Sequence, residues 1–210
     1  MSIPVTLVDY GAGNIRSVTR ALEHEGAEVI LTASPKDIIR AERLLLPGVG
    51  AFGHCMRELG TRGLTEALKE YVTKQRPFLG ICVGMQMLLD SSEEFGEHEG
   101  LGLISGRVKA IAPQADKERV VLPATGWMSL NTHSRVSHPL LGDELAGEAM
   151  YFVHSYMAHP QNPHATLASY RYHGVEVTAA IAEDHVMGVQ FHPEKSGPAG
   201  LALIRRFLSL

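Results

Sequence analysis

The sequence is poor in cysteine and has no long hydrophobic run. Its 210 residues include only two cysteines, Cys55 and Cys82, which indicate no disulfide framework. No apolar run reaches the length needed to span a bilayer, and the first residues lack the basic region and the small-residue cleavage site of a signal peptide. We therefore predict a cytoplasmic protein that makes no membrane contact and whose thiols stay reduced.

The sequence also lacks a large excess of positive or negative charge. The formal net charge of -4 argues against a nucleic-acid partner that is bound by neutralising phosphates. No metal site is predicted, because neither H-E-x-x-H nor paired C-x-x-C spacing occurs, and no cofactor is expected. With 45% hydrophobic and 20% charged residues, the composition is that of a folded globular chain. We predict a single domain over residues 1–210, although the length alone leaves room for two.

The most informative stretch that is present is Gly80-Ile81-Cys82-Val83-Gly84, where an apolar strand is expected to turn directly into a helix. Small residues on both sides of the cysteine let the backbone bend sharply and push the central side chain out of the turn. The serine form of this arrangement is the nucleophile elbow of hydrolases. A buried cysteine beside a glycine-rich packing turn is the alternative, and the pentapeptide alone does not decide between the two.

Apolar runs and helical patterns alternate through the first half of the chain. We expect strands over residues 5–9, 28–31, 43–46 and up to Cys82, and helices over residues 15–22, 64–73 and 83–89. Such alternation indicates βαβ units and a parallel sheet, in which ligands gather at the carboxyl ends of the strands. Three loops are expected to meet at that edge, at residues 9–11, at residues 47–50 and at Cys82.

The second half is richer in strands. We expect strands over residues 106–112, 149–154, 166–172, 175–182 and 186–191, followed by a helix over residues 201–208. The charged segment Asp116–Arg119 is expected to be an exposed hairpin turn or loop. The predicted fold is therefore α/β, with a three-layer, open, mostly parallel sheet that is flanked by helices and extended by antiparallel strands in the C-terminal half.

A second catalytic candidate is the segment His192-Pro193-Glu194. Proline biases the residue before it toward an extended backbone, and residues two apart in an extended chain point to the same side. We therefore expect the carboxylate of Glu194 to orient the imidazole of His192. The imidazole is then able to deprotonate Cys82, which completes the nucleophile, base and orienting group of a triad.

Residues 80–86 together with Gln190-Phe191-His192-Pro193-Glu194 resemble the motifs of class I (triad) glutamine amidotransferases. Further segments resemble the glutaminase subunits of imidazole glycerol phosphate synthases, namely D-Y-G-A-G-N at 9–14, L-P-G-V-G-A-F at 46–52, Y-F-V-H-S-Y at 151–156 and E-K-S-G at 194–197. The resemblance runs from Val5 to Leu208, and the length fits a glutaminase without a fused synthase.

This resemblance implies that Cys82 attacks the side-chain amide of L-glutamine and forms a γ-glutamyl thioester, with His192 as acid and base and Glu194 as its orienting group. Two backbone N–H groups, those of Val83 and Val49, would hold the oxyanion. Because glycines flank Val49, its peptide is able to rotate and act as a switch. The loop at residues 47–50 also fits an ordinary strand-to-helix turn.

The resemblance further implies that glutamine binds to Gly50, Gln86, Ser155 and Tyr156. Ser155 also fits a hydroxyl at a strand end without a ligand, and Tyr156 fits a packed aromatic residue. His154, which precedes them, is interpreted as structural.

Members of this family act with a separate (β/α)-barrel cyclase subunit, through whose interior ammonia travels, and the same heterodimer is implied here. The resemblance places five residues near that interface: Tyr10, Asn14, Trp127, Tyr151 and Lys195. Trp127 fits either a partner anchor or a buried core residue. The chain departs from the family at residues 123–128, where P-A-T-G-W-M stands in place of P-H-M-G-W-N.

Three hypotheses about function follow. The first is a glutaminase that supplies ammonia to the cyclase of imidazole glycerol phosphate synthase and that the cyclase activates. The second is a related amidotransferase subunit that serves a different synthase, for example one that makes an amino-sugar. The third is a thiol hydrolase or a catalytically silent binding module on the same fold.

Overall fold

The computed structural model describes residues 2–112, 120–132 and 138–210. The predicted turn at Asp116–Arg119 lies outside the described residues. Within them, no helix is both long and apolar enough to cross a membrane. The cytoplasmic location stays a prediction.

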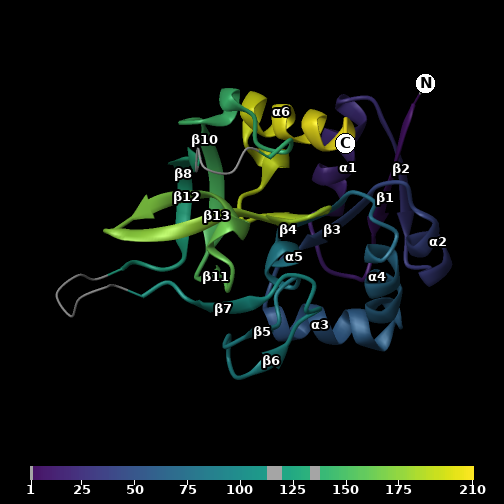
Figure 1. The fold of residues 1–210 in the computed structure, drawn as a ribbon, viewed down its shortest axis with the longest axis horizontal. Helices are drawn as coiled ribbons and strands as arrows, with labels where there is room; N and C mark the ends of the chain where they lie inside the picture. Colours follow the sequence, from purple (N-terminus) through teal and green to yellow (C-terminus); the bar gives the residue numbers. More distant parts are fainter. Residues whose placement is uncertain (1, 113–119, 133–137) are drawn as a thin grey trace.

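A sheet of eight strands runs through the molecule in the order β2-β1-β3-β4-β14-β13-β12-β9 (Figure 1). The parallel strands are β1 (Ile3–Val8), β2 (Ala27–Thr32), β3 (Leu44–Gly48), β4 (Phe78–Cys82) and β14 (Val186–Val189). The antiparallel strands are β13 (Val175–Glu183), β12 (Thr166–Tyr172) and β9 (Asn131–Thr132). Every residue of β3 and β4 is buried, as expected for parallel strands that are covered on both faces.

Helices cover both faces of this sheet and make three layers. The helices α1 (Ile15–His24) and α6 (Gly197–Leu208) lie on one face, and α3 (Phe52–Thr61) and α4 (Leu64–Val72) lie on the other (Figure 1). The short helix α2 (Pro35–Arg40) packs against α4. The predicted fold class is confirmed.

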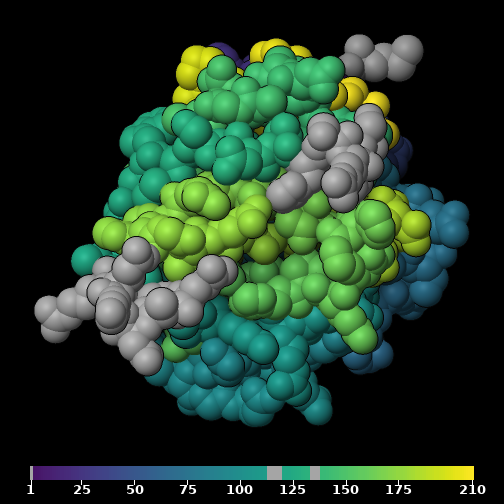
Figure 2. Space-filling view, turned by 60° about the vertical axis from the view of Figure 1, so that its left-hand side comes forward, coloured from purple at the N-terminus to yellow at the C-terminus, as the bar shows by residue number. Residues whose placement is uncertain are grey.

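The described residues of the C-terminal half belong to three separate sheets and do not form a single extension of the parallel sheet. β10 (Ala149–His154) pairs with β8 (Ala124–Ser129), while β11 (Tyr156–Pro160), β7 (Gly106–Ala110), β5 (Ser91–Ser92) and β6 (His98–Glu99) form a four-stranded sheet. Three 3₁₀ helices, η1 (Asp143–Leu145), η2 (Pro163–Ala165) and η3 (Pro193–Lys195), lie between or after these strands. In Figure 2 the green and yellow-green residues of this half cover most of the face that is turned forward.

Some sequence predictions of local structure were wrong. Neither α2 nor α3 was predicted, and Gly53 and Gly60 within α3 lower the helix propensity of that segment. The helix after Cys82, α5 (Val83–Gln86), ends before the predicted residue 89. Its early end has a cause: the carbonyls of residues 87–89 accept hydrogen bonds from the backbone of residues 101–104 instead of continuing a helix.

Candidate active site

Cys82 lies at a strained turn between β4 and α5. Its backbone has a φ of 57° and a ψ of -116°, and Val83 is the first residue of α5. A Cβ atom on Gly84 would collide with the carbonyl oxygen of Leu46, and one on Gly80 would lie 2.6 Å from the carbonyl oxygen of Gly84. The elbow therefore closes only because both glycines lack a side chain.

His192 and Glu194 lie beside this elbow, after β14. His192 Nδ1 is 2.9 Å from Glu194 Oε1, and the side chains are 3% and 1% exposed. Asn14 donates to the same carboxylate oxygen at 3.3 Å. Ser196 Oγ donates to the carbonyl of His192 at 2.6 Å and accepts from the backbone N–H of Tyr151 at 3.0 Å.

The sequence predicted this contact but not the backbone that produces it. His192 itself is extended, but Pro193 to Lys195 form the 3₁₀ helix η3 rather than extended chain. Proline suits the first position of such a helix, because its φ is already helical and it has no N–H to satisfy.

The charge state of His192 follows from its neighbours. Burial lowers the pKa of His192, but hydrogen bonds to Cys82 and to Glu194 outweigh this effect and raise that pKa from 6.5 to about 9. The imidazole is therefore mostly protonated at neutral pH while it contacts the sulfur. A sulfur beside an imidazolium and its carboxylate is the arrangement of an activated thiol nucleophile.

A cavity of ≈ 270 Å³ opens at the Cys82 sulfur. All of the predicted catalytic, oxyanion and substrate-binding residues except Glu194 line it: Cys82, His192, Val49, Val83, Gly50, Gln86, Ser155 and Tyr156. The loops that hold them come from β3, β4, β10 and β14, as expected for a site at the carboxyl edge of a parallel sheet.

Three further residues line the cavity, namely Glu94, Val153 and His154. Glu94 was missed by the sequence analysis. Its Oε2 accepts a hydrogen bond from the backbone N–H of Phe52 at 2.6 Å, which ties the segment after β5 to the start of α3. No pattern around Glu94 in the sequence indicates this position, because the contact joins segments that are 42 residues apart.

Two side chains, those of Tyr10 and Cys55, contact the backbone of the loop at residues 47–50. The hydroxyl of Tyr10 donates to the carbonyl of Pro47 at 2.8 Å, and the thiol of Cys55 lies 3.6 Å from the carbonyl of Val49. Gly50 has a φ of 102°, which only glycine adopts without strain. Both carbonyls that flank the Gly48–Val49 peptide are thus held, and this peptide carries the N–H predicted to bind the oxyanion.

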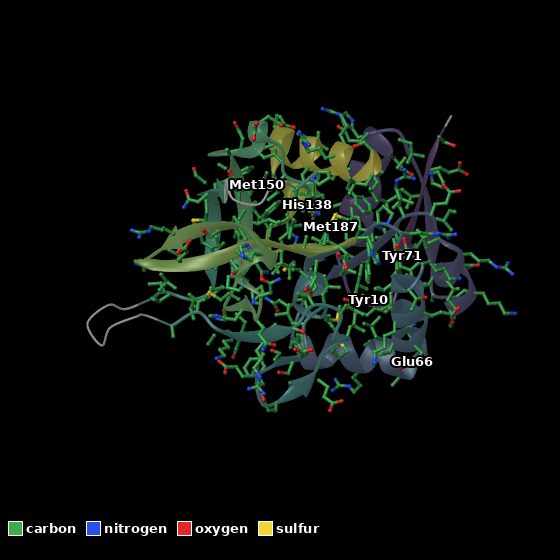
Figure 3. The ribbon with its side chains drawn as sticks, viewed as in Figure 1. Tyr10, Glu66, Tyr71, His138, Met150 and Met187 are labelled. Atoms are coloured by element: carbon green, nitrogen blue, oxygen red, sulfur yellow. The ribbon has the colours of Figure 1, made fainter. Side chains whose placement is uncertain are left out.

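The predicted interface residues differ in exposure: Trp127 and Lys195 are exposed, Asn14 and Tyr151 are half-buried, and Tyr10 is buried. Trp127 is 56% exposed, which excludes the core interpretation, and its ring packs edge-on against Tyr151 with a centroid distance of 6.0 Å. Lys195 Nζ lies 5.8 Å from the centre of the Tyr151 ring. Asn14 contacts Glu194. Tyr10 is fully buried on the α3 side of the sheet (Figure 3), so its side chain offers no surface to a partner, and its place near the interface stays a prediction.

The described residues offer no cluster of three or more His, Cys, Asp or Glu side chains that is arranged to hold a metal ion. The site consists instead of a sulfur, an imidazole, a carboxylate and backbone N–H groups. Such a set suits acyl transfer.

The model of the family "Glutamine amidotransferase class-I" matches residues 6–209 of the chain. The chain belongs to this family. The "Imidazole glycerol phosphate synthase subunit HisH" of Rhodospirillum rubrum is 48% identical to it over 212 residues, which cover 97% of each chain. HisH 1 of Legionella pneumophila (strain Lens) is 44% identical over 210 residues, which cover 98% of this chain and 99% of the relative. These relatives place the chain in the HisH branch, the glutaminase subunits of histidine biosynthesis, and the predicted resemblance is confirmed.

Solved structures agree with this fold. The chain resembles a structure of PurLQS from Thermotoga maritima with a TM-score of 0.73 and 18% identity, covering 100% of this chain and 99% of that one. It also resembles a glutamine amidotransferase from Thermotoga maritima with a TM-score of 0.61 and 14% identity, covering 92% of this chain and 77% of that one. At this identity the likeness shows a shared fold alone.

Proposed function

We propose that the chain is the glutaminase subunit of an imidazole glycerol phosphate synthase, which hydrolyses L-glutamine and passes the ammonia to a separate cyclase subunit. The observation that carries this proposal is the contact of Cys82, His192 and Glu194 at one cavity, in a chain of the HisH branch. We further propose that residues 1–210 form one amidotransferase domain, which the family match over residues 6–209 supports.

In the first half-reaction the Cys82 sulfur attacks the side-chain carbonyl carbon of glutamine. The carbonyl oxygen takes up the electron pair and is held by the N–H groups of Val83 and Val49. When this tetrahedral intermediate collapses, the C–N bond breaks and His192 gives its proton to the leaving nitrogen. The products of this step are ammonia and a γ-glutamyl thioester on Cys82.

In the second half-reaction water attacks the thioester. His192 takes the proton from the water, the C–S bond breaks, and glutamate leaves while the sulfur departs as a thiolate. Glu194 holds the Nδ1 side of the imidazole throughout, so that Nε2 faces the reacting groups. Gly50, Gln86, Ser155 and Tyr156 would hold the glutamine, because they line the same cavity.

The surface beside the triad suggests where the cyclase subunit would dock. An aromatic pair of the exposed Trp127 and the half-buried Tyr151 lies beside Lys195, which directly follows the triad carboxylate. Exposed tryptophan and tyrosine side chains are frequent anchors of protein interfaces. We expect the cyclase to dock on this group and on Asn14, where it would be in contact with the elements that position His192 and Glu194.

A glutaminase assay on the purified chain tests the proposal, with and without the cyclase and its nucleotide ligand. We expect slow hydrolysis by the chain alone and strong activation in the complex. Full turnover without a partner would contradict activation by the cyclase. Failure to bind the cyclase would favour a related amidotransferase of a different synthase.

A glutamine-like electrophile provides the second arm of this test. We expect it to label the native chain and the Cys55→Ser variant, and not Cys82→Ala. Labelling that persists in Cys82→Ala would contradict the assigned nucleophile and favour a thiol hydrolase or a binding module.

A further inference from the structure

A continuous chain of buried hydrogen bonds leads from the carbonyl of Tyr156 to the sulfur of Cys82. The carbonyl oxygen of Tyr156 accepts from Gln86 Nε2 at 3.0 Å, and the same nitrogen donates to Gln190 Oε1 at 2.9 Å. Gln190 Nε2 then lies 3.7 Å from Cys82 Sγ. Gln190 is fully buried and has no contact with solvent.

The orientation of both side-chain amides follows from this chain. A backbone carbonyl only accepts hydrogen bonds, so Gln86 must turn its NH₂ group toward Tyr156. The second proton of that NH₂ group points at Gln190, which must therefore present its oxygen to Gln86. The NH₂ group of Gln190 is left to face the sulfur. Hence Gln190 meets Cys82 as a hydrogen-bond donor, and the opposite amide orientation would break the contact with Gln86.

His154 closes the other end of the chain. Its Nδ1 lies 2.8 Å from the carbonyl of Tyr156, and its Nε2 lies 2.6 Å from the hydroxyl of Tyr170. Because the carbonyl accepts, Nδ1 carries the proton and Nε2 accepts from the hydroxyl. Burial keeps this ring neutral, since it lowers the pKa of His154 to about 4. Both lone pairs of the Tyr156 carbonyl are thus used, which fixes the direction of every donor that follows.

We propose that Gln190 is a catalytic residue, which donates an N–H hydrogen bond to the Cys82 sulfur and stabilises its thiolate. The inference deepens the proposed glutaminase and rests on it. A thiolate is present before attack on glutamine and forms again when the thioester is hydrolysed, so the donor acts in both half-reactions. His192 is the first donor to the sulfur, but it loses this proton when it protonates the leaving nitrogen. Gln190 carries no transferable proton and stays in place throughout.

Gln86 has a defined part in this arrangement. Both of its N–H groups are engaged with Tyr156 and Gln190, so only its oxygen is able to face the cavity. It therefore contributes an acceptor to the substrate, and at the same time it holds Gln190 with its donor toward the sulfur. Gln86 positions Gln190, and Gln190 contacts the reacting atom.

The experiment measures the rate at which iodoacetamide alkylates Cys82 in the full chain as a function of pH. Gln190→Met keeps the length of the side chain but removes the donor. We expect the pH midpoint of alkylation to rise by about one unit and the rate near neutral pH to fall about tenfold, because hydrogen bonds to charged groups are worth at least that much. The plateau rate at high pH should stay unchanged, since the intact thiolate is equally accessible.

A second variant keeps the test decisive if Gln190→Met does not fold. Gln86→Met leaves Gln190 in place but frees its amide to turn over, so we expect a smaller rise of the midpoint and a rate about threefold lower near neutral pH. The matched control is Ser169→Ala, which removes a different buried hydrogen bond, that from Ser169 to Glu176, and should leave the midpoint where it is.

An unchanged midpoint in a folded Gln190→Met chain would overturn the inference, and so would an unchanged midpoint in Gln86→Met when the first variant does not fold. A lower plateau with the same midpoint would also overturn it, because that pattern reports altered access to the sulfur. Alkylation needs no glutamine turnover. The two proposals can therefore fail separately. If the midpoint shifts in the variant but the native chain does not hydrolyse glutamine even with the cyclase, the proposed function is rejected while the contact between Gln190 and the sulfur is supported.

Discussion

The two sides of the active site are held in place by different forces. On the side of the nucleophile, Cys82 is fixed by steric fit: glycines at 80 and 84 let the first turn of α5 pack closely against the backbone of β4 and β3. On the side of the base, His192 and Glu194 are fixed by hydrogen bonds from Asn14 and Ser196. We therefore expect the nucleophile side to be sensitive to an added atom and the base side to be sensitive to a lost donor or acceptor.

The largest expected effect concerns the hydrogen-bonded side. In Glu194→Gln the neutral amide no longer stabilises a protonated His192, so we expect kcat of glutamine hydrolysis in the activated complex to fall about 10³-fold. The control is Glu66→Gln, on α4 (Figure 3), where the side chain of Glu66 is 85% exposed and pairs with Lys69 at 3.7 Å. Its kcat should equal that of the native chain. A fall of less than about tenfold in Glu194→Gln would contradict the role of this carboxylate.

The next largest effect concerns the side of the nucleophile, which depends on steric fit. In Gly84→Ala the new methyl group meets the carbonyl of Leu46, so we expect the free energy of unfolding to fall by about 3 kcal/mol. In Gly60→Ala, where a Cβ meets nothing within 4 Å inside α3, the free energy of unfolding should rise by about 0.5–1 kcal/mol. Urea denaturation measures both. Equal stability of the two variants would show that the elbow is not sterically closed.

The free energy of unfolding should depend on pH because of His192, which belongs to the base side of the site. His192 has a pKa of about 9 in the folded chain against 6.5 without these partners. A raised pKa stabilises the fold most below pH 6.5, and this stability is lost as the pH rises through about 9. We expect a loss of up to about 3 kcal/mol across that window, measured by urea denaturation at several pH values. The loss should be much smaller in His192→Asn, and an equal loss there would assign it to another group.

The smallest expected effect concerns Ser196, which is 1% exposed and joins the carbonyl of His192 to the N–H of Tyr151. Ser196→Ala leaves that N–H without its partner, so we expect the free energy of unfolding to fall by about 1–2 kcal/mol. We also expect kcat to fall a few-fold with little change in KM, because the base moves while the glutamine site does not. A change confined to KM would contradict this role.

The same difference explains how much of the site was predictable from the sequence. The elbow at Cys82 depends on neighbours in sequence, and residues 80–84 predicted it. The contact between His192 and Glu194 was also predicted, because it spans two residues, although η3 rather than extended chain produces it.

What the sequence did not show depends on contacts between distant segments. Glu94 enters the cavity through its bond to Phe52, and Gln190 reaches Cys82 across 108 residues. Tyr10 is likewise buried in a place where its hydroxyl bonds to Pro47, 37 residues away. The parallel part of the sheet was predicted from the alternation of strands and helices. The division of the second half into separate sheets was not, because an apolar strand does not encode its partner.

The pairing of β4 with β14 has a consequence for the synthesis of the protein. β4 carries Cys82, and β14 leads to Gln190, which the ribosome adds 108 residues later. Contacts between segments so far apart form late, since a long loop must close first. A growing chain thus carries the thiol well before it carries the base. In the proposed mechanism, the chain gains the ability to release ammonia only when β14 pairs with β4, so an unfinished subunit would not consume glutamine.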